Sequence, residues 1–165
     1  MEIERKYLVN SLPEDLESYP HVEIEQGYLC TSPTVRVRRM GDVCILTVKE
    51  RIGSGTDSAI VNREEEFTLS AEAFVRLKAK CEGRMVVKTR YRIPLGRRAE
   101  AGGLRSVELT AELDLFHGCH EGMRLVEVEF PDIQSADAFV PPAWFGADVS
   151  NDKRYRNSHL AFSNL

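Results

Sequence analysis

The segment EIERKYLV, residues 2–9, alternates charged and apolar side chains. On a β-strand, side chains two residues apart point to the same face, so Glu2, Glu4 and Lys6 share one face. The opposite face is largely apolar. A strand of a soluble sheet usually turns its apolar face to the core and its polar face to water. The fold therefore depends on whether other strands repeat this pattern, so that their charged faces look at one another.

Most of the chain repeats this two-residue period. Strands are expected at 22–29, 34–39, 43–49, 60–69, 86–93, 106–115 and 124–130, which makes about eight with the first. Helices are expected at 11–19, 70–83, 135–139 and 157–165, and loops at 51–58 and 96–103, which are rich in Gly, Ser or charge. The segment 22–29 is the least regular strand, because Val22, Ile24, Gln26 and Tyr28 make a mixed face.

The polar faces of these strands are sorted by charge. Segments 34–39 and 86–93 are basic, whereas 60–69, 106–115 and 124–130 are acidic. Two architectures fit this pattern. One is an antiparallel sheet whose charged face meets water. The other is a closed barrel with charged faces inside and apolar faces packed outward, and at about eight strands its interior holds side chains or one small ligand.

A charged interior has an energetic consequence. Burying an unpaired charge costs several kcal/mol per ion, so the interior must be wet, internally paired or filled by a ligand of matching charge. Arg and Lys suit a polyanion, since both bind phosphate oxygens. Carboxylate pairs such as Glu2/Glu4 and Glu127/Glu129 repel each other unless a cation lies between them. Ligands that are all oxygen select hard cations such as Mg²⁺, Mn²⁺ or Ca²⁺.

The composition is that of one ordinary globular domain, expected over residues 1–165. The chain is 42% hydrophobic and 29% charged, and its net charge of −4 gives no sign of a nucleic-acid partner. No apolar run approaches the roughly 18 residues of a membrane span, and the charged start does not resemble a signal peptide. The four cysteines are scattered, which favours buried, reduced thiols and a cytoplasmic location.

Short motifs occur in a fixed order along nearly the whole chain. They are EIERK (2–6), QGYL (26–29), RVR (36–38), LTVK (46–49), EEE (64–66), VVKTRY (86–91), ELDLF (112–116), LVEVEF (125–130) and DKRYRN (152–157). In this order the chain resembles the CYTH superfamily, the triphosphate tunnel metalloenzymes. It is most similar to short bacterial members, several of which are inorganic tripolyphosphatases.

The resemblance implies a mainly β, α+β fold: an eight-stranded antiparallel closed barrel, the triphosphate tunnel, with a few helices outside. It implies divalent metal ligands at Glu2, Glu4, Glu127 and Glu129, with Mg²⁺ or Mn²⁺ as cofactor. It implies phosphate ligands at Lys6, Arg36, Arg38, Lys49, Lys88, Arg90, Lys153 and Arg154. Further tunnel acids are expected at Glu64, Glu66, Glu112 and Asp114. Catalytic roles are expected for Glu2, Glu4, Lys6, Lys88 and Tyr28, the last near the reacting phosphate.

The implied function is metal-dependent hydrolysis of a linear triphosphate, most simply inorganic tripolyphosphate, to pyrophosphate and phosphate. An adenylate cyclase, a thiamine or nucleoside triphosphatase, and a non-catalytic polyphosphate-binding module are the alternatives; a homodimer stays open. One departure stands out, because Asn62 occupies a position where short members carry Arg, and Arg63 follows. If the strand were slipped by one residue, Glu65 would face inward in place of Glu64 and Glu66.

Overall fold

The computed structural model describes residues 2–56, 59–101 and 105–163. The strands are β1 (Glu2–Val9), β2 (His21–Thr31), β3 (Thr34–Met40), β4 (Val43–Thr56), β5 (Ala59–Leu69), β6 (Glu82–Ala101), β7 (Arg105–Phe116), β8 (Arg124–Glu129) and β9 (Phe145–Asp148). The α-helices are α1 (Ala71–Lys78), α2 (Ile133–Ala138) and α3 (Asn157–Leu160), and 3-10 turns η1 (Leu16–Ser18), η2 (Gly118–His120) and η3 (Lys153–Tyr155) join them.

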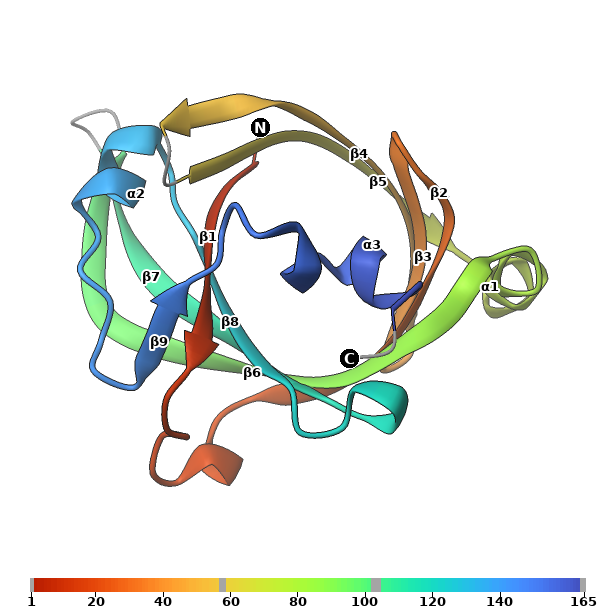
Figure 1. Ribbon diagram of the computed structural model, residues 1–165, viewed down its shortest axis with the longest axis horizontal. Helices are drawn as coiled ribbons and strands as arrows, with labels where there is room; N and C mark the ends of the chain where they lie inside the picture. Colours follow the sequence, from red (N-terminus) through yellow and green to blue (C-terminus); the bar gives the residue numbers. More distant parts are fainter. Residues whose placement is uncertain (1, 57–58, 102–104, 164–165) are drawn as a thin grey trace.

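Eight antiparallel strands close into a barrel. The order is β5-β4-β3-β2-β6-β7-β8-β1, and β1 returns to pair with β5, which leaves a ring when viewed along the barrel (Figure 1). The first residues of β1 pair with β5, with Glu2 opposite Asn62. The following residues pair with β8, with Lys6 opposite Glu127. The ninth strand, β9, pairs with the end of β1. The closed-barrel prediction is confirmed.

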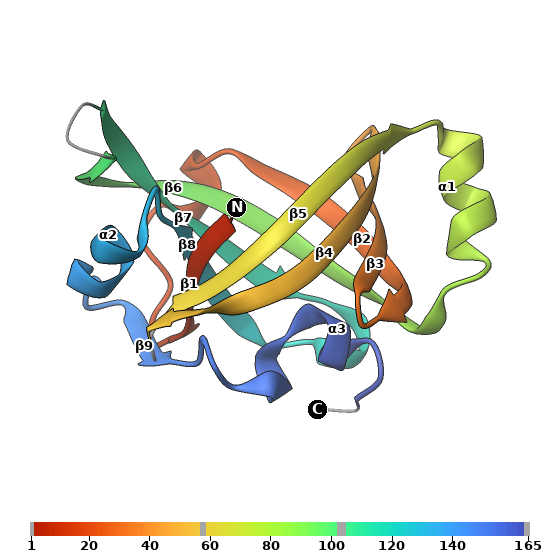
Figure 2. The same cartoon turned by 90° about the horizontal axis from the view of Figure 1, so that it is seen from above.

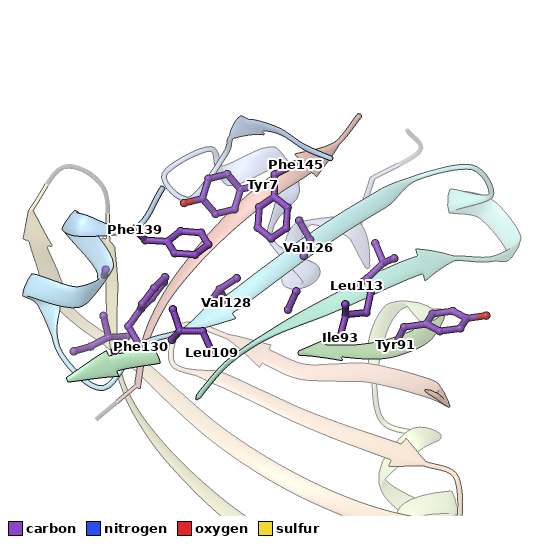
Figure 3. Close-up of a cluster of buried hydrophobic side chains, with 14 of the residues drawn as sticks. Tyr7, Tyr91, Ile93, Leu109, Leu113, Val126, Val128, Phe130, Phe139 and Phe145 are labelled. Carbon is purple, nitrogen blue, oxygen red and sulfur yellow. The ribbon is translucent and has the colours of Figure 1, made fainter. Parts of the chain in front are cut away.

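The apolar core lies outside the barrel wall, as expected for a barrel whose charged faces point inward. On one side, residues of β1, β7 and β8 such as Leu113, Val126 and Val128 pack beneath α2 and β9, where Phe139 and Phe145 cover them (Figure 3). On the other side, α1 lays Phe74 against Val37 and Cys44 of β3 and β4. Ser70 caps α1 by accepting a hydrogen bond from the amide of Ala73. The strands can therefore direct their charged faces inward.

The chain after β9 closes one end of the barrel. We call residues 149–163 the C-terminal plug; its helix α3 lies within the ring in Figure 1 and at one end of the barrel in Figure 2. The amide of Val149 donates to the carbonyl of Lys6 at 2.8 Å, and the amide of Arg84 donates to the carbonyl of Ala161 at 2.7 Å. Leu160 packs into the barrel among buried residues that include Phe116. The C-terminal plug therefore closes the cavity at this end of the barrel.

Several predicted elements differ from the structure. The segments 51–58 and 96–103, predicted as loops, lie mostly in strands, since β4 runs to Thr56 and β6 to Ala101; residues 57–58 and 102–104 lie outside the described part. The helix predicted at 11–19 is only the turn η1. The short strand β9 was not predicted.

The helices and the cysteines test two further expectations. In the described residues, no helix combines the length and hydropathy needed to cross a bilayer. All four cysteines are free thiols, but they are not uniformly buried as predicted: Cys44 is buried, whereas Cys119 on η2 is exposed.

Candidate active site

A cavity of about 640 Å³ occupies the inside of the barrel. Most of its charged lining residues separate into two halves. We call β4, β3 and β6 the basic wall; it contributes Lys49, Arg36, Arg38, Lys88, Arg90 and Arg92. We call β7, β8, β1 and β5 the acidic wall; it contributes Glu112, Glu127, Glu129, Glu2, Glu4, Glu64 and Glu66. The strand order of the barrel thus converts charge sorting along the sequence into two facing surfaces.

Lys6 adds a base to the acidic wall, where it meets Glu127 directly. The Lys6 Nζ atom lies 2.8 Å from Glu127 Oε1, and Arg90 Nη2 lies 3.2 Å from Glu127 Oε2. Burial alone would raise the pKa of Glu127, but Lys6 and Arg90 hold it well below its usual value. Glu127 is therefore an ionised, fully engaged carboxylate that links the two walls.

Among the ion pairs of the described residues, Lys88 and Asp114 form the most buried, each with a side chain only 1% exposed. The Lys88 Nζ atom lies 2.5 Å from Asp114 Oδ2, and Arg90 Nε lies 2.7 Å from Asp114 Oδ1. Burial, aided by the nearby Arg90 charge, lowers the pKa of Lys88 to about 8 despite its carboxylate partner. Asp114 thus holds Lys88 and Arg90 in place by ion pairs, and it does not itself line the cavity, where it was predicted.

Lys49 is the base around which three glutamates gather. Its Nζ atom lies 2.5 Å from Glu2 Oε2, 3.5 Å from Glu64 Oε2 and 3.9 Å from Glu4 Oε2. Burial opposes its charge, but Glu4 and Glu2 outweigh burial and raise the pKa of Lys49. Lys49 therefore stays protonated at any pH where the protein would work.

Two further carboxylates, Glu129 and Glu4, are crowded by other acids in the cavity. Burial and then the charges of Glu112 and Glu2 raise the pKa of Glu129 to about 7. Burial also raises the pKa of Glu4, with Glu127 and Glu2 adding to it against the opposing charge of Lys49. Mutual repulsion of this kind is what a divalent cation relieves, and the donors are all oxygen, which suits Mg²⁺ or Mn²⁺.

The present side-chain orientations in the described part of the chain do not form a metal site. Among the described residues, no three His, Cys, Asp or Glu side chains are gathered closely enough to hold a metal ion. Glu2 is turned to Lys49 and Glu127 to Lys6. The four carboxylates predicted as metal ligands all line the cavity, so a cation would gather them by rotating side chains away from the lysines. The chemistry of the residues fits the cation, and their present rotamers favour the lysines.

Two of the three arginines of β3, Arg36 and Arg38, line the cavity, and Arg38 Nη2 pairs with Glu66 Oε1 at 3.4 Å. Arg36 Nη2 donates to Thr47 Oγ1 at 3.2 Å, and within the described chain the buried Nε atoms of Arg36 and Arg38 have no hydrogen-bond partner. Burial, together with Arg36 and Arg90, lowers the pKa of Arg38 to about 10. Guanidinium groups crowded together without full partners form a site for a polyanion.

Tyr28 stands between the charged strands of the basic wall, on β2. It is buried, and burial raises the pKa of its phenol, which stays protonated. Gln26 Nε2 donates a hydrogen bond to the Tyr28 hydroxyl at 2.9 Å. Gln26 is not among the site residues predicted from the sequence, although its place two residues before Tyr28 on the same face is a usable signal.

The C-terminal motif places a different arginine at the cavity from the one predicted. Lys153 and Arg154 are exposed and do not line the cavity; Arg154 pairs with Asp152 at 2.7 Å and its side chain is 69% exposed. Arg156 lines the cavity together with Asn157 and Arg51. Burial, with the nearby charge of Arg51, lowers the pKa of Arg156. The turn η3 points Arg154 outward and brings Arg156 in.

The register of β5 answers the question raised by Asn62. Lys49 lies opposite Glu64 and Thr47 opposite Glu66, so both glutamates face inward as predicted and Glu65 is exposed. Asn62 lines the cavity and donates to Glu2 Oε2 at 3.5 Å. The strand is not slipped, and the amide of Asn62 contacts the acidic wall without adding a charge.

Comparison with known proteins agrees with this architecture. No family model matches the chain. The chain is 39% identical to an inorganic triphosphatase of Nitrosomonas europaea, covering 98% of this chain and 97% of the relative. It is 32% identical to an inorganic triphosphatase of Acetivibrio thermocellus, covering 96% and 92%.

Solved structures show the same similarity. The crystal structure of the inorganic triphosphatase NE1496 superposes with a TM-score of 0.68 at 36% identity, covering 99% of this chain and 95% of that one. A Hippeastrum protein described as a putative adenylyl cyclase with a dominant triphosphatase activity shares the fold, with a TM-score of 0.56 at 15% identity over 83% of each chain.

The eight-stranded antiparallel barrel and its charged cavity are what the resemblance to the CYTH superfamily implies, and the relatives at 39% and 32% identity over nearly the whole chain support that class. Within that class, the extent of identity with curated relatives shows that the chain belongs to the inorganic triphosphatase family.

Proposed function

We propose that the cavity binds a linear triphosphate and hydrolyses it to pyrophosphate and phosphate, with inorganic tripolyphosphate as the substrate. One observation carries the proposal: the basic wall and the acidic wall face each other across one cavity. The basic wall matches the phosphate oxygens, and the acidic wall matches the cations that accompany a polyphosphate. The names of the relatives support the same reaction.

The lining supports an inorganic substrate over a nucleotide or thiamine ester. Two tyrosines, Tyr28 and Tyr155, line the cavity, but purely apolar side chains there are few, with Met40, Pro33 and Val149 the clearest, whereas charged side chains extend throughout. A nucleobase gains affinity mainly by stacking or apolar burial, which such a lining offers sparingly. A substrate that is charged along its whole length uses every part of this surface.

The roles of the residues follow from their positions. Arg36 and Arg38 offer planar forks to phosphate oxygens, while Lys6, Lys88 and Arg90 are fixed by carboxylates and hold further oxygens in place. In place of Arg154, we propose that Arg156 completes the phosphate set from the C-terminal plug. Tyr28, protonated at neutral pH, donates a hydrogen bond to a phosphoryl oxygen.

Glu2, Glu4, Glu127 and Glu129 would hold one or two Mg²⁺ or Mn²⁺ ions. When bound, the cation neutralises phosphate oxygens and lowers the pKa of a coordinated water. Glu129, the exposed member of this set, would help to hold the attacking water. The remainder of the catalysis is positioning and charge stabilisation by the basic wall.

The decisive experiment measures phosphate and pyrophosphate release from tripolyphosphate, ATP and thiamine triphosphate, with Mg²⁺, with Mn²⁺ and with chelator. The variant Glu4→Ala tests the acidic wall, and Glu121→Ala, at an exposed position outside the cavity, is the matched control. Metal-dependent release from tripolyphosphate, lost in Glu4→Ala alone, supports the proposal. Cyclic AMP from ATP would assign a cyclase, and binding without turnover would leave a polyphosphate-binding module.

We also propose a cytoplasmic location, supported by the free thiols of all four cysteines. To test this, the protein is extracted from cells without reductant, unfolded and alkylated, and its intact mass is measured. Four alkylated, and therefore reduced, thiols are expected. Size-exclusion chromatography with light scattering decides between a monomer and a homodimer.

A further inference from the structure

Gln26 is a polar side chain sealed inside the barrel wall. Its side chain is fully buried, and it does not line the cavity. Its Nε2 atom donates to the Tyr28 hydroxyl, and its Oε1 atom has no hydrogen-bond partner in the described part of the chain. A buried amide with an orphan carbonyl costs free energy, so its one hydrogen bond invites a functional explanation.

The backbone of β2 is shaped to bring these two side chains together. The pairing between β2 and β6 shifts register between Gln26 and Tyr28, at Gly27. A Cβ atom at Gly27 would lie 2.5 Å from Met85 Sδ and 2.8 Å from Cys81 Sγ. Glycine therefore lets the strand pack closely on its outer side while Gln26 and Tyr28 stay adjacent on the inner side.

The direction of the Tyr28 proton follows from its neighbours. The hydroxyl oxygen accepts a hydrogen bond from Gln26, and Arg36, its cross-strand neighbour, can only donate. Neither contact can take the phenolic proton. Because Tyr28 lines the cavity, the open direction for that proton is into the cavity.

We propose that Gln26 is a positioning residue, which holds the Tyr28 hydroxyl so that its proton points at a phosphoryl oxygen of the substrate. The identity of that substrate rests on the proposed function; the hydrogen bond between Gln26 and Tyr28 does not. Gln26 acts only through Tyr28, which makes the two side chains energetically coupled. Their coupling is what separates a positioning role from a purely structural one.

The experiment is a double-mutant cycle with an NMR readout. Gln26→Met, Tyr28→Phe and the double variant are compared with the unaltered protein, and Ile24→Val on the same strand, also buried and outside the lining, controls for core packing. Steady-state kinetics with tripolyphosphate gives kcat and KM. Tyrosine labelled with ¹³C at Cζ reports the hydrogen bonding of each phenol, and Tyr28→Phe assigns the Tyr28 resonance.

We expect Gln26→Met to lower kcat about 3- to 10-fold, the scale of one hydrogen bond, and to change it less than about twofold in the Tyr28→Phe background. The Tyr28 resonance should shift in Gln26→Met without ligand. Addition of tripolyphosphate should shift it in the unaltered protein, and less in Gln26→Met. Ile24→Val should leave the resonance in place.

Three results would overturn the proposal. The first is that Gln26→Met lowers kcat equally in the unaltered protein and in the Tyr28→Phe background. The second is a Tyr28 resonance whose chemical shift does not change in Gln26→Met. The third is a Tyr28 resonance whose chemical shift does not change when tripolyphosphate binds. If the unaltered protein binds tripolyphosphate without hydrolysing it, the proposed function fails, and the NMR shifts still decide the role of Gln26. If tripolyphosphate does not bind at all, both proposals fall.

Discussion

Glu4 and Glu129 lie directly opposite each other across strands β1 and β8, so two carboxylates project from paired positions into one cavity. Neighbouring strands therefore place like charges side by side, which an ordinary antiparallel pair avoids. The pKa of Glu129 is raised to about 7 by burial first and then by the carboxylates around it, Glu112, Glu2 and Glu4. A protein that keeps such a pair gains from it when a divalent cation occupies the space between.

This pair predicts a pH-dependent affinity for the cation. In the metal-free protein Glu129 takes up a proton below about pH 7, and that proton competes with the metal. The affinity for Mn²⁺, measured by titration calorimetry, should rise by up to about tenfold per pH unit below pH 7 and level off above it. Glu129→Gln should weaken binding and flatten this dependence, whereas Glu121→Gln should leave both unchanged. An unaltered slope in Glu129→Gln would contradict the assignment.

The raised pKa of Glu129 also makes the stability of the folded protein depend on pH. Since the pKa of Glu129 is raised from 4.5 to about 7, the folded protein holds this proton more tightly than the unfolded chain. The contribution is complete below pH 4.5 and is lost as the pH rises through 7. We expect the Tm of the metal-free protein to fall less across this window in Glu129→Gln than in the unaltered protein, as measured by calorimetry in chelator.

Lys88 predicts a limit on the alkaline side. Its pKa of about 8 means that the free protein loses this cation above pH 8. Because kcat/KM reports the free enzyme, its value for tripolyphosphate should fall above about pH 8. Lys88→Arg keeps a charge at high pH and should remove this decline, though at a lower overall rate, because a planar guanidinium does not reproduce the ammonium contact with Asp114. A flat profile in the unaltered protein would show that Lys88 stays charged.

Most of the barrel could be predicted because alternating charged and apolar residues specify both a strand and its two faces. The eight predicted strands correspond to β1 to β8. The hairpin ends were missed because their Gly, Ser and charged residues favour loops locally. Cross-strand pairing, such as Arg51 with Asn62 and Arg98 with Glu108, extends the strands where local composition does not. The four residues of β9 carry too short a pattern to be recognised.

Most cavity residues on strands followed from the same alternation, but Arg156 at the cavity and Gln26 in the barrel wall did not. Arg156 lies just beyond a 3-10 turn, where neither the strand nor the helix period tells which side chain points inward. Gln26 is polar although it is fully buried, so it blurred the pattern of its strand. For Arg156 the decisive information is a tertiary contact that one sequence does not contain, whereas for Gln26 the sequence offers only its position two residues before Tyr28.

The two arginines of the C-terminal motif provide a matched pair. Arg156→Met removes a cavity base, and we expect the KM for tripolyphosphate to rise about tenfold or more, the scale of a charged hydrogen bond. Arg154→Met removes an exposed arginine paired with Asp152 and should change KM less than about twofold. Steady-state phosphate release measures both. The reverse order of effects would place Arg154 at the substrate.

Gly83 and Gly96 form a second matched pair, which tests whether the C-terminal plug completes the site. Both have positive φ, +68° and +63°, so alanine strains the backbone at either position by about 1–2 kcal/mol. At Gly96 a Cβ would meet nothing within 4 Å, but at Gly83 it would lie 2.5 Å from the carbonyl oxygen of Ala161, the acceptor of the plug's hydrogen bond from Arg84.

We therefore expect Gly83→Ala to lower the free energy of unfolding by about 1–3 kcal/mol more than Gly96→Ala, as measured by urea denaturation. The plug carries Arg156, and its Asn157 side chain accepts a hydrogen bond from Lys88 at 3.4 Å, so a displaced plug should also weaken tripolyphosphate binding. Gly96→Ala should bind normally, because its strain lies away from the plug. If Gly83→Ala were destabilised but bound tripolyphosphate as tightly as Gly96→Ala, the plug would serve only to close the barrel, and the phosphate site would be built by the strands alone.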